Sequence, residues 1–199
     1  MTTPLPRNHI APPYAPDQVA GYLDMAEDQS TEARRRTAFG ILAAGLGAGL
    51  MPGEHLTITG RAITTTPAGN TVVPVKGSRP RTIPVLAAYT PLILTLAGRY
   101  PDEPLVGPSH DPGKNRLNRL LSKIETPRNL PPLNTSSLRS TWLLTLLAAH
   151  VPLPEIMAAA GLASTGFLAD LLPYLPRLNQ DEAHRTIAQA LTQPPQTGT

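Results

Sequence analysis

The sequence predicts an α+β fold that is mostly helical and contains one small three-stranded antiparallel sheet. Apolar residues recur at helical spacing before position 50 and again after position 91. Between these stretches, residues 56–85 are rich in β-branched side chains and are interrupted by glycine and proline turns. The 199 residues fit one domain of ordinary size, and they contain no internal repeat.

The first elements are an arm and two helices. Prolines are spread through residues 1–16, where each removes a backbone donor, so we expect a flexible proline-rich arm there. Helical spacing begins at Asp17 and is interrupted at Gln29 and Ser30. A second helix is expected from position 30 or 31 until the glycines at positions 45, 47 and 49 weaken it.

The sheet is expected from four β-branched segments, which are residues 56–59, 62–66, 71–75 and 82–85. Pro74 and Pro84 cannot donate to a strand ladder, so their strands should be short or lie at an edge. Helical spacing then returns at residues 92–97, 114–124, 138–149, 154–160 and 167–172. We therefore expect one domain over residues 17–178, followed by a C-terminal helix and a loose tail over residues 179–199.

Composition excludes several classes of function. The chain has no cysteine, which excludes disulfides and thiolate catalysis, and its five histidines do not follow a metal-ligand spacing. Aromatic residues make up only 4%, so a stacking platform for single-stranded nucleic acid is not expected. The chain shows neither a signal-peptide pattern nor an apolar stretch long enough for a membrane helix. We expect a cytoplasmic protein without metal, cofactor or membrane association.

Positive charge is concentrated in one stretch, although the net charge is only +3. Residues 114–139 contain six cationic side chains and a single acidic one, Glu125. Within that stretch, Arg116, Arg119 and Lys123 recur at i, i+3 and i+7, opposite an apolar face. This pattern predicts an amphipathic helix whose basic face contacts DNA, and its alternative is a solubilising surface.

Four blocks in the second quarter and the second half of the chain carry a resemblance to a known family. They are AGLMPGEHL (48–56), VKGSRPRTIPV (75–85), SSLRSTW (136–142) and VPLPEIMAAAGL (151–162). Their order and spacing resemble the catalytic domain of tyrosine recombinases, the phage integrases. The corresponding blocks of that family read TGLRxxEL, GKGxxxRxVPL, HxLRHTxA and VxLxxIxxxLGH, with the nucleophilic tyrosine nine residues later. The resemblance covers residues 15–176, which correspond to the catalytic half of such proteins.

The resemblance implies a site for a scissile phosphate. In the family, two arginines and a histidine hold the phosphate, a hairpin lysine protonates the leaving oxygen, a second histidine or a tryptophan supports the phosphate, and the tyrosine attacks it. Carried over residue by residue, Arg139 matches the second arginine and Lys76 the hairpin lysine. The four other positions hold Met51, Ser136, Leu162 and Leu171.

These replacements indicate a degenerate relative that binds DNA without cleaving it. Loss of one preorganised phosphate donor costs about 3 kcal/mol of transition-state stabilisation. Loss of the nucleophile removes the covalent route itself. Double-stranded DNA is the expected partner, and the expected contacts are Lys76, Arg79, Arg81, Lys114, Arg116, Arg119, Lys123 and Arg139.

Two alternatives remain open. Tyr174, three residues beyond Leu171, or a tyrosine from a partner subunit would make the protein an active recombinase, although Tyr174 is also an ordinary amphipathic packing residue. The other alternative is a protein that pairs with an active integrase, or with a second copy of itself, without touching DNA. Each of the two matched residues also has an alternative without a functional role: Lys76 could be a solvated lysine at a hairpin tip, and Arg139 could be a member of a surface or structural ion pair.

Overall fold

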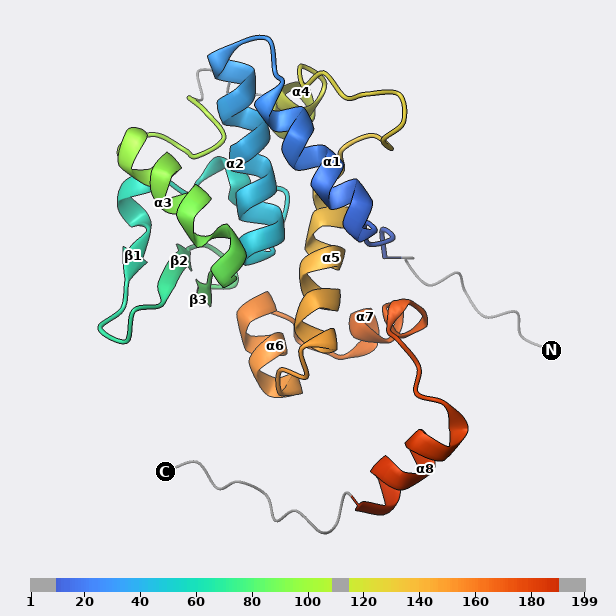
Figure 1. Ribbon diagram of the computed structural model, residues 1–199. Helices are drawn as coiled ribbons and strands as arrows, with labels where there is room; N and C mark the ends of the chain where they lie inside the picture. Colours follow the sequence, from blue (N-terminus) through green and yellow to red (C-terminus); the bar gives the residue numbers. More distant parts are fainter. Residues whose placement is uncertain (1–9, 109–114, 190–199) are drawn as a thin grey trace, which may run out of the picture.

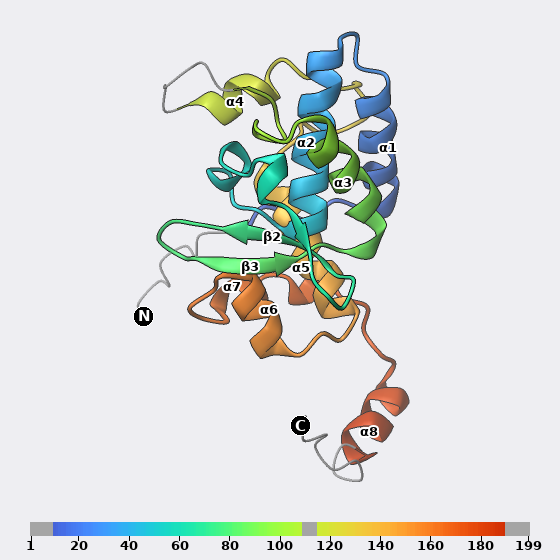
Figure 2. The ribbon, with the colours of Figure 1, turned by 90° about the vertical axis from the view of Figure 1, so that its left-hand side faces the viewer.

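The computed structural model describes residues 10–108 and 115–189, and it confirms the predicted α+β fold. Figure 1 shows helices α1 (Pro16–Glu27), α2 (Glu32–Ala48) and α3 (Thr90–Arg99) packed together, with α5 (Thr135–Ala148) running past them. The small sheet lies between these helices and the pair α6 (Leu153–Ala160) and α7 (Gly166–Ala169), as Figure 2 shows. The described chain contains no helix long and apolar enough to cross a membrane.

Helix α2 is the centre of the molecule. It contacts α1, α3 and α5, and its residues contribute to both hydrophobic clusters of the core. Of the three glycines expected to weaken this helix, Gly45 and Gly47 lie within it and Gly49 is its C-terminal cap. A Cβ on Gly45 would lie 2.7 Å from the Cβ of Leu138, so glycine permits the close approach of α5. Gly49 ends the helix with φ 56°, the left-handed conformation that glycine adopts without strain.

The sheet has the order β1–β2–β3 and is antiparallel throughout. Its strands are β1 (Thr64–Thr65), β2 (Thr71–Val75) and β3 (Arg81–Pro84). Pro74 is tolerated in the central strand because β1 pairs only with Thr71 and Val72, which leaves the far end of β2 with a single neighbour.

The prediction of a strand over residues 56–59, the first of the four expected segments, is wrong. The chain there forms a 3-10 turn, η1 (Glu54–Leu56), because the Glu54 N–H donates to the Met51 carbonyl and the Thr57 N–H to the Glu54 carbonyl. Thr59 then makes an isolated bridge to Pro104. The segment therefore closes the loop after α2 and adds no strand to the sheet.

The remaining helices follow the predicted order, and two of them, α4 and α7, are shorter than expected. Helix α4 covers Arg116–Leu121, although the spacing predicted a helix over residues 114–124; Lys114 lies outside the described residues. Between α7 and α8 (Gln180–Gln189), the chain forms the short turn η4 (Leu172–Tyr174). Helix α8 has no buried residue and projects away from the body of the protein (Figures 1 and 2).

The described part of the expected arm packs against the domain. Tyr14 is 8% exposed, and its hydroxyl donates to the Pro132 carbonyl at 3.0 Å and accepts from the Asn134 N–H at 2.8 Å. Its ring lies 4.7 Å from that of Tyr22, centroid to centroid. These contacts hold residues 10–15 beside the start of α5, whereas residues 1–9 and the expected tail at 190–199 lie outside the described residues.

Candidate nucleic-acid interface

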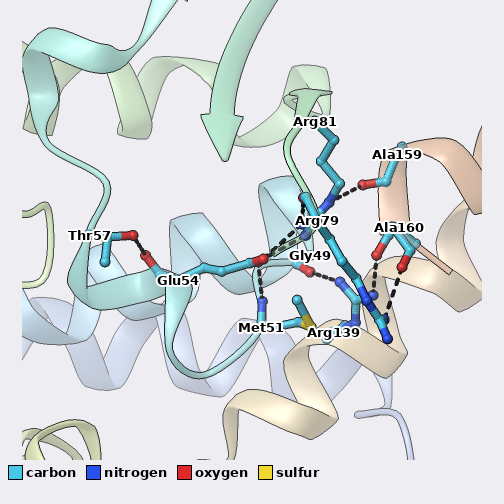
Figure 3. Close-up of polar contacts among 10 residues, drawn as sticks. Gly49, Met51, Glu54, Thr57, Arg79, Arg81, Arg139, Ala159 and Ala160 are labelled. Carbon is cyan, nitrogen blue, oxygen red and sulfur yellow. Dashed lines mark hydrogen bonds and ion pairs between the residues drawn. The ribbon is translucent and has the colours of Figure 1, made fainter. Parts of the chain in front are cut away.

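Arg139 matches the second arginine of the family pattern, and its side chain points into the protein. It lies in the first half of α5 and is 6% exposed. One terminal guanidinium nitrogen donates to the Gly49 carbonyl and the other to the Ala160 carbonyl, the latter at 2.6 Å (Figure 3). Arg139 therefore joins the end of α2 to the end of α6. These two bonds use one N–H of each terminal nitrogen, so a phosphate contact by Arg139 would have to use its remaining N–H groups from this nearly buried position.

Burial lowers the pKa of Arg139 to about 10, and repulsion from Arg81 and Arg79 adds to this effect, partly opposed by attraction to Glu54. The guanidinium nevertheless remains charged at neutral pH. A buried charge is tolerated only where its hydrogen bonds are made, and the two carbonyls supply them. The neighbouring arginines show that positive charge gathers on this side of the molecule.

Arg81 is also held internally. Its two terminal nitrogens donate to the two carboxylate oxygens of Glu54 at 2.8 and 2.9 Å, and its Nε donates to the Ala159 carbonyl at 2.9 Å (Figure 3). The side chains of this ion pair are 6% and 12% exposed. Burial alone would raise the pKa of the Glu54 carboxyl, but the hydrogen bonds from Arg81 and the Met51 N–H outweigh it and lower that pKa. This bidentate ion pair fixes β3 to the loop after α2.

The tip of the β2–β3 hairpin carries two exposed cations. Lys76 is exposed and has no partner among the described residues, and Gly77 turns the chain with φ 109°. Arg79 is exposed and donates through one nitrogen to the Gly161 carbonyl at 3.1 Å. Both side chains are exposed and keep N–H donors that no described residue uses, whereas the side chains of Arg81 and Arg139 are only 6% exposed.

The replaced positions of the family pattern differ in their surroundings. Met51 is half-buried beside Glu54, and Ser136 is exposed in the first turn of α5. Leu162 is half-buried after Gly161, and Leu171 is fully buried in the core. At the position that the sequence pattern matches to the family's nucleophile, this chain therefore has an enclosed apolar side chain.

Tyr174, the candidate replacement nucleophile, lies at the end of the 3-10 turn η4 and is 49% exposed. Its hydroxyl has no partner among the described residues. A tyrosine activated for attack requires a base or a cation that lowers its pKa or accepts its proton. The described residues provide no such contact to Tyr174.

The basic stretch does not form one continuous helical face. Arg116 is half-buried, with one terminal nitrogen enclosed and unpartnered, and Lys123 follows the end of α4. Lys123 lines a cavity of about 510 Å³ together with Arg34, Arg36 and Tyr100. Of the predicted DNA contacts, the structure brings together Arg79, Arg81 and Arg139, with Lys76 on the same hairpin. The α4 cations belong to a separate part of the surface.

Glu54 and His55 have structural roles that the sequence reasoning did not assign. Glu54 matches the glutamate of the family block TGLRxxEL, and this match was the feature of the sequence that could have indicated its role. His55 is 1% exposed, neither ring nitrogen has a partner among the described residues, and burial lowers its pKa to about 4. His55 is therefore neutral at physiological pH. No group of metal-binding side chains occurs within the described residues.

The fold is that of the tyrosine recombinase catalytic domain. The structure of XerA recombinase matches with a TM-score of 0.60 and 14% identity, over 97% of this chain and 67% of that one. XerH recombinase bound to difH substrate in a pre-cleavage complex matches with a TM-score of 0.60 and 14% identity, over 96% of this chain and 57% of that one.

The Tn1549 transposon integrase in complex with circular intermediate DNA matches with a TM-score of 0.55 and 15% identity, over 89% of this chain and 66% of that one. The chain thus spans between 57% and 67% of the length of these three proteins. No protein-family model and no curated protein matches the sequence. The similarity to solved structures confirms the predicted fold.

Proposed function

We propose that this protein binds the phosphate backbone of double-stranded DNA and does not cleave it. Its fold is one that XerH and the Tn1549 integrase use in complex with DNA. The observation that carries the proposal is the contrast between two positions of that fold. Leu171, which the sequence pattern matches to the family's nucleophile, is fully buried, while Lys76 and Arg79 remain exposed on the hairpin.

The proposed DNA contact is made by the hairpin tip. Arg81 and Arg139 use their terminal nitrogens within the protein, on Glu54 and on main-chain carbonyls. Lys76 and Arg79 extend from the same hairpin and have donors to spare. Contacts to phosphate carry no base information, so the proposed binding is the same for unrelated sequences.

Fluorescence anisotropy with two unrelated duplexes tests the binding. The double variant Lys76→Ala/Arg79→Ala should weaken the affinity for both duplexes about ten- to hundredfold, because two charge-assisted contacts are lost. A matched control is Arg61→Ala/Arg99→Ala, which removes the same charge from two exposed surface ion pairs elsewhere. Equal affinities for the two double variants would contradict the hairpin contact.

A suicide DNA substrate tests the absence of cleavage. Such a substrate traps a covalent protein–DNA link, and we expect none, because Leu171 offers no nucleophile. A trapped adduct that disappears in Tyr174→Phe would instead establish an active recombinase. An adduct formed only when an active recombinase is added would identify a nucleophile supplied by a partner.

Pairing with another protein chain is a second candidate function, favoured by α8. None of the described residues of this helix is fully buried, and Ile187 is 71% exposed. Leu178, just before the helix, is 56% exposed. Sedimentation velocity of the wild type and of Ile187→Asp distinguishes the candidates: self-association lost in the variant supports a protein partner for this helix, and a monomer in both cases contradicts pairing with a second copy.

A further inference from the structure

A cavity of about 510 Å³ lies beside the N-terminal half of α2, where α4 approaches it (Figures 1 and 2). Its walls come from α2, from the segment after α3 and from α4. Its volume is typical of small-molecule sites, which occupy roughly 300–1,000 Å³. Arg36 lines the cavity, and at about 1.5 Å of rise per residue it lies about 20 Å from Gly49, where α2 ends. The cavity is therefore distant from the end of α2 that Arg139 contacts.

Part of the cavity lining is apolar. Val106 and Ile124 are 0% and 7% exposed, and Leu120 is half-buried. Ala33, in the first turn of α2, is exposed and lines the cavity too. Removing apolar surface from water is favourable, so a ligand gains free energy by covering these residues. The lining therefore suits a ligand with a hydrocarbon body.

Positive charge predominates in the rest of the lining. Its described residues include three cations and one acid, which are Arg34, Arg36, Lys123 and Glu32. The Glu32 carboxylate is already engaged, because one of its oxygens lies 3.0 Å from Nη1 of Arg99 and accepts from the Tyr100 hydroxyl at 3.1 Å. Its other oxygen accepts from Arg35 at 3.4 Å. The acid is thus held by groups other than the three cations of the lining.

Arg36 places a fixed positive charge in the cavity wall. The residue is 7% exposed, and its guanidinium carbon lies 3.5 Å from the centroid of the Tyr100 ring. Its terminal nitrogens donate to the Glu103 carboxylate at 2.6 Å and to the Pro104 carbonyl at 2.8 Å, whereas its Nε has no partner among the described residues. The Glu103 side chain is 48% exposed, so water screens its charge. A buried charge such as that of Arg36 attracts a neighbouring anion more strongly than an exposed one does.

Arg34 and Lys123 have donors left for a ligand. One terminal nitrogen of Arg34 binds Ser30 and Glu125, and its other side-chain nitrogens have no partner among the described residues. Lys123 is exposed, and no described residue binds its ammonium group. These two cations can therefore bind an anionic group without giving up a contact within the described chain.

We propose that this cavity binds a small organic carboxylate with an aromatic or branched hydrocarbon body. The hydrocarbon covers the apolar lining, and the carboxylate binds Arg34 and Lys123 close to the buried charge of Arg36. Inorganic phosphate would satisfy the cations but leave the apolar lining in water, and an uncharged ring would do the reverse. The inference does not depend on the proposed DNA contact, because Lys76 and Arg79 lie outside the cavity lining.

NMR titration of the assigned protein with 2-naphthoate tests the site directly. Its uncharged analogue 2-naphthamide and inorganic phosphate are titrated separately. We expect saturable shifts at the amides of Ala33, Gly107 and Ile124 with 2-naphthoate, binding of 2-naphthamide that is about tenfold weaker, and no saturable shifts with phosphate. Absence of these shifts with 2-naphthoate, equal affinity for 2-naphthamide, or equal shifts with phosphate would overturn the proposal.

The double variant Arg34→Gln/Lys123→Gln tests the charge of the site. It should weaken 2-naphthoate binding about tenfold and leave the affinity for 2-naphthamide unchanged. The melting temperature should change little, because the ion pair of Arg34 with Glu125 is partly exposed. The matched control is Arg61→Gln/Arg128→Gln, which removes the same charge from exposed positions outside the lining. Equal losses of 2-naphthoate affinity in the two double variants would contradict the site.

The variant Ala33→Leu tests the location of the site. Ala33 is exposed and leucine is a strong helix former, so the fold is retained. The larger side chain takes up part of the cavity, and the affinity for 2-naphthoate should fall about tenfold, a change of 1.4 kcal/mol. The control is Ala20→Leu, at an exposed position of α1 outside the lining. Unchanged 2-naphthoate affinity in Ala33→Leu, or an equal loss in Ala20→Leu, would contradict the assignment to this cavity.

Discussion

Replacing Arg139 by methionine separates a structural arginine from a phosphate-binding one. The substitution keeps an unbranched apolar stem in the core but removes both donors, leaving the Gly49 and Ala160 carbonyls without this partner. Each buried acceptor left unsatisfied costs about 1–3 kcal/mol. The substitution also removes a desolvated charge that Arg81 and Arg79 repel, which offsets part of the loss.

The net effect expected for Arg139→Met is a loss of about 3 kcal/mol in the free energy of unfolding. For a chain of 199 residues, this corresponds to a melting temperature about 6–12 °C lower. Urea denaturation and thermal scans measure both quantities, and Arg128→Met, at an exposed position, is the control. Where the variant is still folded, its duplex affinity should fall less than about threefold, a change under 1 kcal/mol.

An unchanged melting temperature together with a loss of duplex affinity above about tenfold would refute this reasoning, since tenfold corresponds to 1.4 kcal/mol of binding. That combination would mean that Arg139 turns outward in solution and holds a phosphate. The carbonyls of Gly49 and Ala160 would then be satisfied by water.

Three further predictions concern the loop after α2 and its surroundings. Because burial lowers the pKa of His55 to about 4, the unfolded chain binds protons that the folded chain does not, and the free energy of unfolding should fall by about 2 kcal/mol from pH 7.5 to pH 5.0. His55→Leu should abolish this fall in urea titrations at the two pH values, and an equal fall in the variant would contradict the assignment. Met51→Arg should lower the melting temperature by several degrees if apolar side chains fill its surroundings; unchanged stability with tighter duplex binding would show that the family's phosphate pocket is still open. Gly49→Ala should destabilise by more than about 1 kcal/mol in the same assays, since its Cβ would lie 2.1 Å from the Trp142 ring; equal stability would contradict this packing.

The order of elements was predictable because helical and strand periods differ. Strands β2 and β3 and helices α3, α5 and α6 follow their periodicity closely. Periodicity and propensity do not explain helix α2. Gly45 has a low helix propensity, so the sequence predicts that it weakens the helix, whereas in the fold it lets Leu138 of α5 approach closely. Residues 56–59 likewise have strand propensity, but the turns from Met51 to Thr57 override it.

The candidate site was predictable in position but not in orientation. The blocks contain Arg79, Arg81 and Arg139, which lie close together in the fold (Figure 3), and Lys76 belongs to the same hairpin as Arg79 and Arg81. Nothing in the local sequence indicates that Arg139 spans two carbonyls from segments 90 and 21 residues away, because these acceptors meet only in the folded chain. The basic spacing of residues 116–123 similarly predicts a longer helix than the six residues of α4.

The dependence of duplex affinity on salt tests the central claim, that exposed cations of the hairpin bind the DNA backbone. Anisotropy titrations between 50 and 200 mM salt give the slope of log affinity against log salt concentration for the wild type and for Lys76→Ala/Arg79→Ala. Each phosphate contact contributes about 0.9 to this slope, so the variant's slope should be shallower by about 1.8 for both of two unrelated duplexes. Wild-type binding that does not weaken with salt, or identical slopes in the two proteins, would contradict the claim.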